Sequence, residues 1–223
     1  MSWRNYISKI TIKQLEGNKT SLYVPVLNSN GLIQTTDSDI SEVLADSFEK
    51  TSSFSNYSPA FLELKQRKEK ERFTVSPANY NLLDLSITLE ELDFALTNCR
   101  NSAPGSDDIS FLLLKKLPSS RKLCLLQAYS ALYLTGSYPA IWSTALIIPI
   151  AKPGKPKTEA TSYRPISLTC TMCKLFEKIL NKRLTWYLES QNLLHPTQCG
   201  FRNSRSTADN LLTLETEIHD AFA

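Results

Sequence analysis

The strongest hydrophobic pattern in the chain is a helical stripe between residues 172 and 188. Apolar side chains recur there at spacings of three and four residues, the repeat of an α-helix with one buried face. Capping residues and the same spacing predict further helices, one opening with the pair Asp39 and Glu42 and one with Thr88 and Glu91. We therefore predict helices over residues 39–48, 88–99, 112–117, 123–134 and 172–188, and a last one that opens at Ser206.

Two apolar stretches between these helices have the pattern of strands. Residues 144–150 are apolar and β-branched and are bounded by turn residues, which favours a buried strand over a helix. Residues 163–168 follow a segment rich in Pro, Gly and Lys, so we expect an antiparallel pair with the turn 152–155 at an exposed tip. Helices around a small antiparallel β-hairpin predict an α+β fold.

The first 84 residues are more polar and irregular than the rest. Residues 65–72 alternate Lys and Arg with Gln and Glu, a pattern that favours a solvated helix face over a nucleic-acid patch. We predict a linker or arm over residues 1–84 and a folded domain over residues 85–223. Within that domain, the pattern of residues 103–107 predicts a turn in which Gly105 supplies a positive φ.

Composition limits the possible functions. The chain has 25 basic and 22 acidic residues, so its net charge of +3 requires any grip on nucleic acid to be local. Five cysteines without a secretory leader argue against a disulfide framework. No apolar run is long enough to cross a bilayer. We expect an intracellular protein of the cytoplasm or nucleus, neither secreted nor in a membrane.

Candidate chemistry lies in the basic hairpin and in the loop before the last helix. The hairpin has the character of a polyanion-binding element, although Arg164 could also be an exposed strand-end charge in a local ion pair. The loop could seat a phosphate at a helix N-terminus, or it could be a capped helix with incidental arginines. A zinc site from Cys170, Cys173, His195 and Cys199 is a weaker alternative.

Five segments taken in order resemble the N-terminal part of a reverse transcriptase from a non-LTR (LINE-type) retrotransposon, most like the jockey group. The resemblance runs from about residue 88 to residue 223, whereas earlier residues resemble only loosely the linker before such a domain. The five segments are residues 101–109, 142–155, 162–168, 174–179 and 198–207.

The resemblance implies the fingers and the start of the palm of a right-hand polymerase. It implies that Arg164 and Lys152 approach the phosphates of a deoxynucleoside triphosphate in the complete domain. An RNA template, a DNA primer or an RNA–DNA hybrid is the implied partner. The implied template and primer contacts are Lys155, Gln198, Gly200, Phe201, Arg202, Arg205 and Ser206.

The metal-binding aspartates of that family have no counterpart in this sequence. We therefore expect a fragment that ends before the catalytic aspartates, with no catalytic residue, no metal ligand and no cofactor of its own. Mg²⁺ is expected only with the absent palm segment, and the chain alone is expected to be inactive. The alternatives are a non-catalytic nucleic-acid-binding or interaction protein derived from such an element, and an unstable relic.

Overall fold

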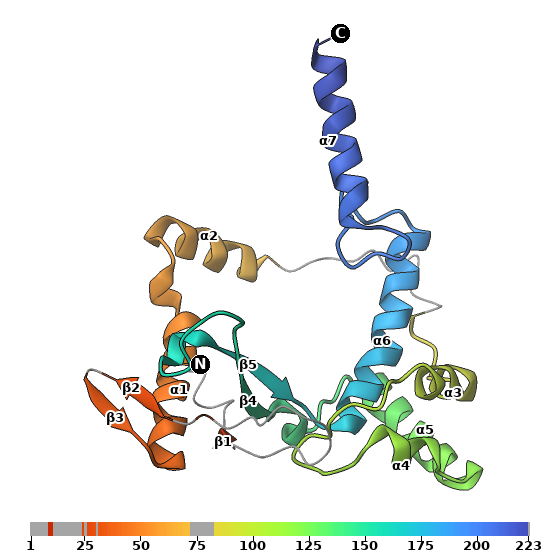
Figure 1. Ribbon diagram of the computed structural model, residues 1–223. Helices are drawn as coiled ribbons and strands as arrows, with labels where there is room; N and C mark the ends of the chain where they lie inside the picture. The colour runs from red at the N-terminus through yellow and green to blue at the C-terminus, as the bar shows by residue number, and fades with distance from the viewer. Residues whose placement is uncertain (1–8, 11–23, 25, 30, 72–82, 223) are drawn as a thin grey trace. The chain divides into compact units, whose positions relative to one another are not determined.

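The computed structural model describes residues 9–10, 24, 26–29, 31–71 and 83–222 (Figure 1). The chain divides into two compact units, Met1–Lys178 and Ile179–Ala223, with the boundary inside helix α6 (Thr171–Ser190). This boundary differs from the change in composition near residue 84, which stays a prediction about domain extent.

Helices and small sheets make up the described residues, so the predicted α+β class is confirmed. The helices before α6 are α1 (Asp37–Thr51), η2 (Phe54–Asn56), α2 (Pro59–Lys70), α3 (Leu89–Thr97), α4 (Phe111–Lys115), α5 (Ser119–Thr135), η4 (Ala140–Ser143) and η5 (Ala160–Ser162). The strands are β1 (Lys9–Ile10), β2 (Leu27–Ser29), β3 (Leu32–Gln34), β4 (Leu146–Ala151) and β5 (Tyr163–Leu168), and α7 (Thr207–Phe222) follows α6.

The predicted β-hairpin is confirmed as the antiparallel pair β4–β5. Its register runs from Leu146 opposite Leu168 to Ala151 opposite Tyr163. Two prolines, Pro149 and Pro165, lie directly opposite each other. Their missing N–H groups therefore affect a single step of the ladder. The short strand β1 pairs in parallel with β4, which makes a three-stranded sheet, while β2 and β3 form a separate antiparallel pair.

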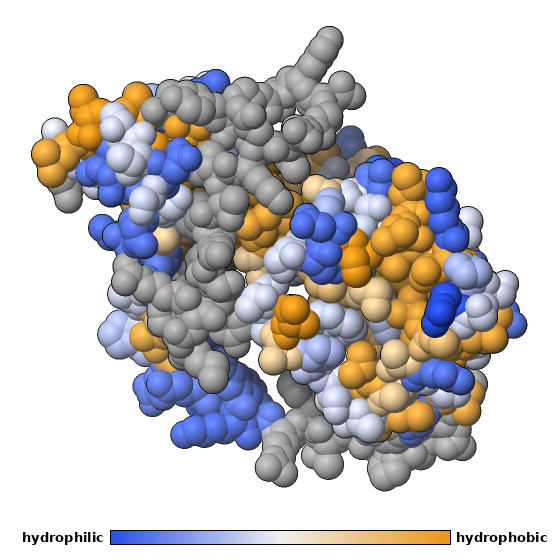
Figure 2. Space-filling model, turned by 90° about the horizontal axis from the view of Figure 1, so that it is seen from below, coloured by the Kyte–Doolittle hydropathy of each residue, from blue (hydrophilic) through white to orange (hydrophobic). Residues whose placement is uncertain are grey.

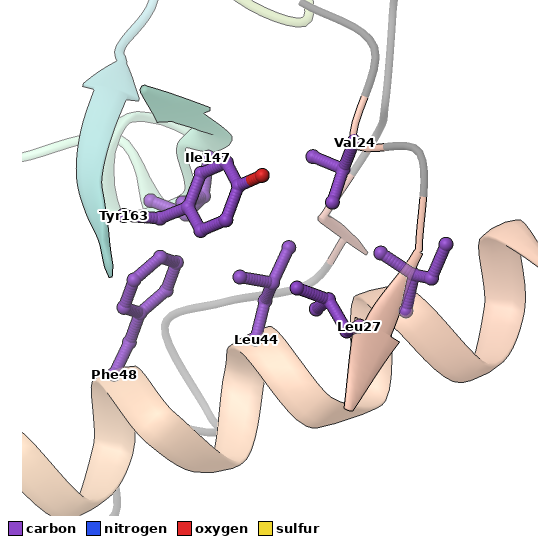
Figure 3. Packing of buried hydrophobic residues seen from close by; sticks show 7 residues of the cluster. Val24, Leu27, Leu44, Phe48, Ile147 and Tyr163 are labelled. Carbon is purple, nitrogen blue, oxygen red and sulfur yellow. The ribbon is translucent and has the colours of Figure 1, made fainter. Parts of the chain in front are cut away.

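Helix α1 packs its apolar face against one face of this hairpin. Ile40, Leu44 and Phe48 are buried in one cluster with Ile147 of β4 and Tyr163 of β5 (Figure 3). The cluster also contains Val24 and Leu27. The predicted buried face of this helix is confirmed, and burial of such a set is a main source of fold stability.

The start of α1 differs from the prediction. Thr36 is the N-cap residue, and its hydroxyl oxygen accepts from the backbone N–H of Asp39 at 3.2 Å. Asp39 instead lies in the first turn, where its carboxylate accepts from the Thr36 hydroxyl at 2.6 Å. Both residue types are good caps, which is why the pattern alone placed the start too late.

A second core joins α5, η4 and α6. The rings of Tyr129, Trp142 and Phe176 meet with centroid separations of 5.2 to 6.3 Å. The Tyr129 hydroxyl donates to the Met172 carbonyl at 2.6 Å, so the buried phenol is satisfied. Helix α5 ends at Gly136, whose φ of 60° is the left-handed conformation common at helix C-termini.

The turn at residues 103–107 exists for a different reason from the one predicted. Gly105 does not have a positive φ; the positive φ lies at Asp108, at 53°. A Cβ on Gly105 would lie 2.5 Å from the Thr169 carbonyl oxygen and 2.7 Å from the Cys170 nitrogen. Glycine is needed here because two stretches of backbone come into contact, not because of the backbone angle.

The surface of the first unit is mixed. The charge run on α2 is exposed, with ion pairs from Lys65 to Glu69 at 3.5 Å and from Lys68 to Glu71 at 2.9 Å, as expected for a solvated helix face. Exposed hydrophobic residues occur on α3, α4 and α5, and Figure 2 shows hydrophobic patches interspersed with hydrophilic ones on the face that it presents. None of the helices in the described ranges is long and apolar enough to span a bilayer.

Candidate nucleic-acid interface

The β4–β5 hairpin presents two cations to solvent. Arg164 is exposed on β5, directly opposite Ile150 of β4. Lys155 is exposed in the turn, where Gly154 has a φ of 69°. Among residues 9–10, 24, 26–29, 31–71 and 83–222, neither side chain has an ion-pair partner. The hairpin thus offers both charges to a ligand.

The connection between the two strands is held by hydrogen bonds. The Lys152 ammonium donates to the Thr161 carbonyl at 2.7 Å, and its backbone N–H donates to the Ser162 carbonyl at 2.7 Å. The Tyr163 hydroxyl donates to the Lys157 carbonyl at 2.7 Å, and the Asn28 N–H donates to the Thr158 carbonyl at 2.8 Å. Lys152 therefore closes the loop with one of its three protons, while Lys155 lies at the open tip.

The loop between α6 and α7 is the second candidate surface. Phe201 has a φ of 61° and is fully exposed to solvent. Arg205 is exposed as well, and Ser204 beside it also has a positive φ, at 57°. Gly200 has open space around it, and the Gln198 amide donates to the Gly200 carbonyl at 3.5 Å. The ring of Phe201 is therefore open to a ligand, and the positive φ of this bulky residue is an uncommon conformation that the surrounding loop must hold.

Arg202 is engaged inside this loop. Its Nε and Nη2 donate to the two carboxylate oxygens of Glu189 at 2.9 and 2.6 Å. Its Nη1 donates to the carbonyls of His195 and Gln198 at 3.2 and 3.4 Å. Hydrogen bonds from the guanidinium hold the pKa of Glu189 below its usual value. Glu189 was not among the residues that the sequence singled out, although it lies in the last turn of α6.

An acidic residue in the first turn of α7, Asp209, caps the N-terminus of that helix. The Asp209 carboxylate accepts from the Ser206 N–H at 2.5 Å and from the Ser206 hydroxyl at 3.0 Å. These hydrogen bonds lower the pKa of Asp209. Because a carboxylate already occupies the donors of Ser206, the cation next to the cap, Arg205, is the better placed group for a phosphate.

The turn at residues 103–108 is fastened to the start of α6. The Cys170 thiol donates to the Asp107 carboxylate at 2.7 Å, and the Lys174 ammonium donates to the Ala103 carbonyl at 3.1 Å. The Cys173 sulfur and the Tyr138 hydroxyl form a hydrogen bond of 2.8 Å. The two cysteines thus serve different partners, and the described residues contain no group of three or more possible metal ligands. The residues joined by the first two of these hydrogen bonds lie 63 and 71 positions apart in the chain, so no local sequence pattern predicts the contacts.

Comparison with known proteins shows which family the chain resembles. The family model described as reverse transcriptase (RNA-dependent DNA polymerase) matches residues 150–222, which include Arg164 of β5 and the loop before α7. The chain is 30% identical over 202 residues to the probable RNA-directed DNA polymerase from transposon X-element of Drosophila melanogaster. It is 32% identical over 163 residues to that from transposon BS, and 28% over 187 residues to that from mobile element jockey, both of the same organism.

These matches cover 89%, 73% and 83% of this chain but 22%, 18% and 20% of the relatives. The chain therefore spans about a fifth of the length of the curated relatives that it matches. The family model and these relatives agree with one another, and with the family that the five sequence segments resemble. The chain belongs to the reverse transcriptase family, among the RNA-directed DNA polymerases of non-LTR retrotransposons.

Proposed function

We propose that this chain contributes the fingers and the start of the palm of a reverse transcriptase, where it binds an RNA template paired with a DNA primer. The β4–β5 hairpin is the fingers element in this proposal, and the loop before α7 is the template and primer element. The relatives named above are RNA-directed DNA polymerases, which need such elements to hold a polyanion.

The observation that carries the proposal is the presentation of Arg164 and Lys155 on a hairpin whose loop is held by hydrogen bonds. Arginine suits phosphate because its planar fork donates two parallel hydrogen bonds and stays charged at all working pH values. A strand fixes the direction of Arg164, so less conformational freedom is lost when a phosphate binds. Lys152 lies beside this pair and can add a contact with its remaining protons.

The loop before α7 supplies a different kind of contact. The exposed ring of Phe201 can stack on a nucleotide base, which is a contact that tolerates any sequence. Arg205 can meet the adjacent backbone phosphate. A stacked base and a paired phosphate together suit a single strand, such as the unpaired part of a template.

The chemical step is not assigned to the described residues. Polymerases join nucleotides with two metal ions held on a carboxylate cluster. No group of three or more possible metal ligands is found among the described residues, and we assign no magnesium ligand to them. The proposed role of these residues is therefore to bind and orient template, primer and nucleotide phosphates.

Photochemical cross-linking tests this proposal directly. An RNA strand carrying 5-iodouridine, annealed to a DNA primer, is irradiated with the full chain, and the linked peptides are identified by mass spectrometry. We expect links to peptides that contain residues 152–164 and 198–206. The peptide that spans α2 serves as the internal control, because α2 carries as many Lys and Arg residues as the segment 152–164. Links that fall mainly on α2 would overturn the assignment of both surfaces.

A further inference from the structure

The guanidinium of Arg202 uses four of its five N–H donors on partners between residues 189 and 198. Two of its nitrogens form a parallel pair with the Glu189 carboxylate, at 2.9 and 2.6 Å, and the third donates to two backbone carbonyls. Its side chain is only 14% exposed, against 33% for Glu189. This is the geometry of a clamp, because a phosphate contact would need at least one edge of the fork open to solvent.

The clamp connects three parts of the chain. Glu189 belongs to the last turn of α6, the two carbonyls belong to His195 and Gln198, and Arg202 itself follows the most exposed aromatic residue of the loop. One side chain therefore closes the segment from residue 189 to residue 202. Phe201, at a φ of 61°, lies next to the closing residue.

We infer that Glu189 and Arg202 are positioning residues that hold Phe201 and Arg205 in place for nucleic acid, and that Arg202 does not itself contact phosphate. This inference rests on the proposed function of the loop. It assigns to Glu189, an acidic residue near a proposed polyanion site, a role that favours binding. The lowered pKa of Glu189 agrees with this role, because the carboxylate stays ionised, and the pair intact, to more acidic pH than a free glutamate would allow.

Two explanations of the Glu189–Arg202 pair predict opposite effects of Glu189→Gln on nucleic-acid binding. If Glu189 merely masked a phosphate-binding Arg202, Glu189→Gln would free the arginine, remove a repulsive charge and strengthen binding. If the pair positions the loop, the same substitution loosens Phe201 and Arg205 and weakens binding. We expect a loss of about tenfold, the size of a lost charge-assisted hydrogen-bond pair that is partly exposed.

The binding experiment uses the full chain and a fluorescein-labelled RNA–DNA hybrid with a single-stranded RNA overhang. Glu215→Gln is the matched control, since it removes one exposed acid from α7. Arg202→Lys keeps the charge but loses the fork, so it should weaken binding about as much as Glu189→Gln. Tighter binding by Glu189→Gln, or unchanged binding by both variants, would overturn the inference.

Hydrogen–deuterium exchange tests the positioning role without any nucleic acid. In Glu189→Gln the amides of residues 198–206 should exchange at least about fivefold faster, while the first two turns of α6 keep their protection. Glu215→Gln should leave the loop unchanged. Equal exchange in wild type and Glu189→Gln would refute the clamp. The expected effect on exchange with no binding by wild type would instead refute the proposed function and leave the clamp standing.

Discussion

At Gly105 the chain passes so close to the backbone of Thr169 and Cys170 that no other residue fits. A Cβ at this position would meet a carbonyl oxygen at 2.5 Å, and backbone atoms cannot swing aside as a flexible side chain would. The same loop is fastened by Asp107 to Cys170. This single residue therefore decides how the loop lies on the start of α6.

We predict that Gly105→Ala lowers the free energy of unfolding by about 2–3 kcal/mol, the upper range for overpacking. Urea denaturation followed by circular dichroism measures the change. Gly200→Ala is the matched control, because nothing lies within 4 Å of its Cβ position and its φ is not positive. A cost for Gly105→Ala no larger than that of Gly200→Ala would show that the close approach is absent in solution.

The cysteines give a second prediction at this scale. Cys124 is exposed, whereas Cys99, Cys170, Cys173 and Cys199 are buried. Burial raises the pKa of Cys173 from 9.0 to about 11, and burial with the bond to Asp107 raises that of Cys170. Only the thiolate reacts, so at pH 8 a disulfide reagent should modify Cys124 quickly and the other four slowly. Fast modification of Cys170 or Cys173, found by peptide mapping, would contradict their packing.

The raised pKa of Cys173 also makes the free energy of unfolding depend on pH. A thiol whose pKa is raised by folding adds stability below its unfolded pKa and loses it as the pH rises through the folded value. The unfolding free energy should therefore fall between pH 9 and pH 11, and less so in Cys173→Ala.

Among the elements, α1 contributes most to the buried cluster at the hairpin, because Ile40, Leu44 and Phe48 are three of its seven residues. Leu44 is completely buried there, with Ile147 and Tyr163 of the two strands (Figure 3). We predict that Leu44→Ala costs about 2–5 kcal/mol, the range for a buried leucine, and speeds amide exchange in β4 and β5. Leu32→Ala, at a side chain 67% exposed on β3, should cost little. Equal costs would mean that α1 does not support the hairpin.

The elements that the sequence predicted are those with a local signal. The β4–β5 pair and helices α3, α5 and α6 follow from periodicity, a capping box or a Gly stop. Strands β2 and β3 were missed even though Asn30-Gly31 between them is a known hairpin signal. Strand β1 could not be found, because parallel pairing with β4 joins residues more than a hundred positions apart.

The candidate site was predictable in part for the same reason. The exposed cations Lys155 and Arg164 follow from a basic turn between two strands. The clamp of Arg202 on Glu189 could not be predicted, since thirteen residues and a loop separate the two. The sequence showed the donors of the loop but not which of them are already used.

At the scale of the whole molecule, charge is the property that bears on function. A net charge of +3 is too small to draw nucleic acid to the chain in general. Binding must come from cations placed where phosphates can reach them, and we assign these to the hairpin and to the loop before α7. Exposed cations also lie on α2, where glutamates surround them. The number of cations that meet phosphate can be counted from the dependence of affinity on salt.

The most direct test is therefore the slope of log affinity against log salt concentration for an RNA–DNA hybrid. Each lost phosphate contact flattens this slope by about 0.7–0.9. We predict that Arg164→Ala combined with Arg205→Ala flattens it by about 1.5, whereas Arg67→Ala combined with Lys70→Ala, which removes two exposed cations from α2, changes it by less than about 0.5. If the slope flattens in the α2 variant and stays unchanged in the hairpin and loop variant, the assignment of both surfaces is contradicted.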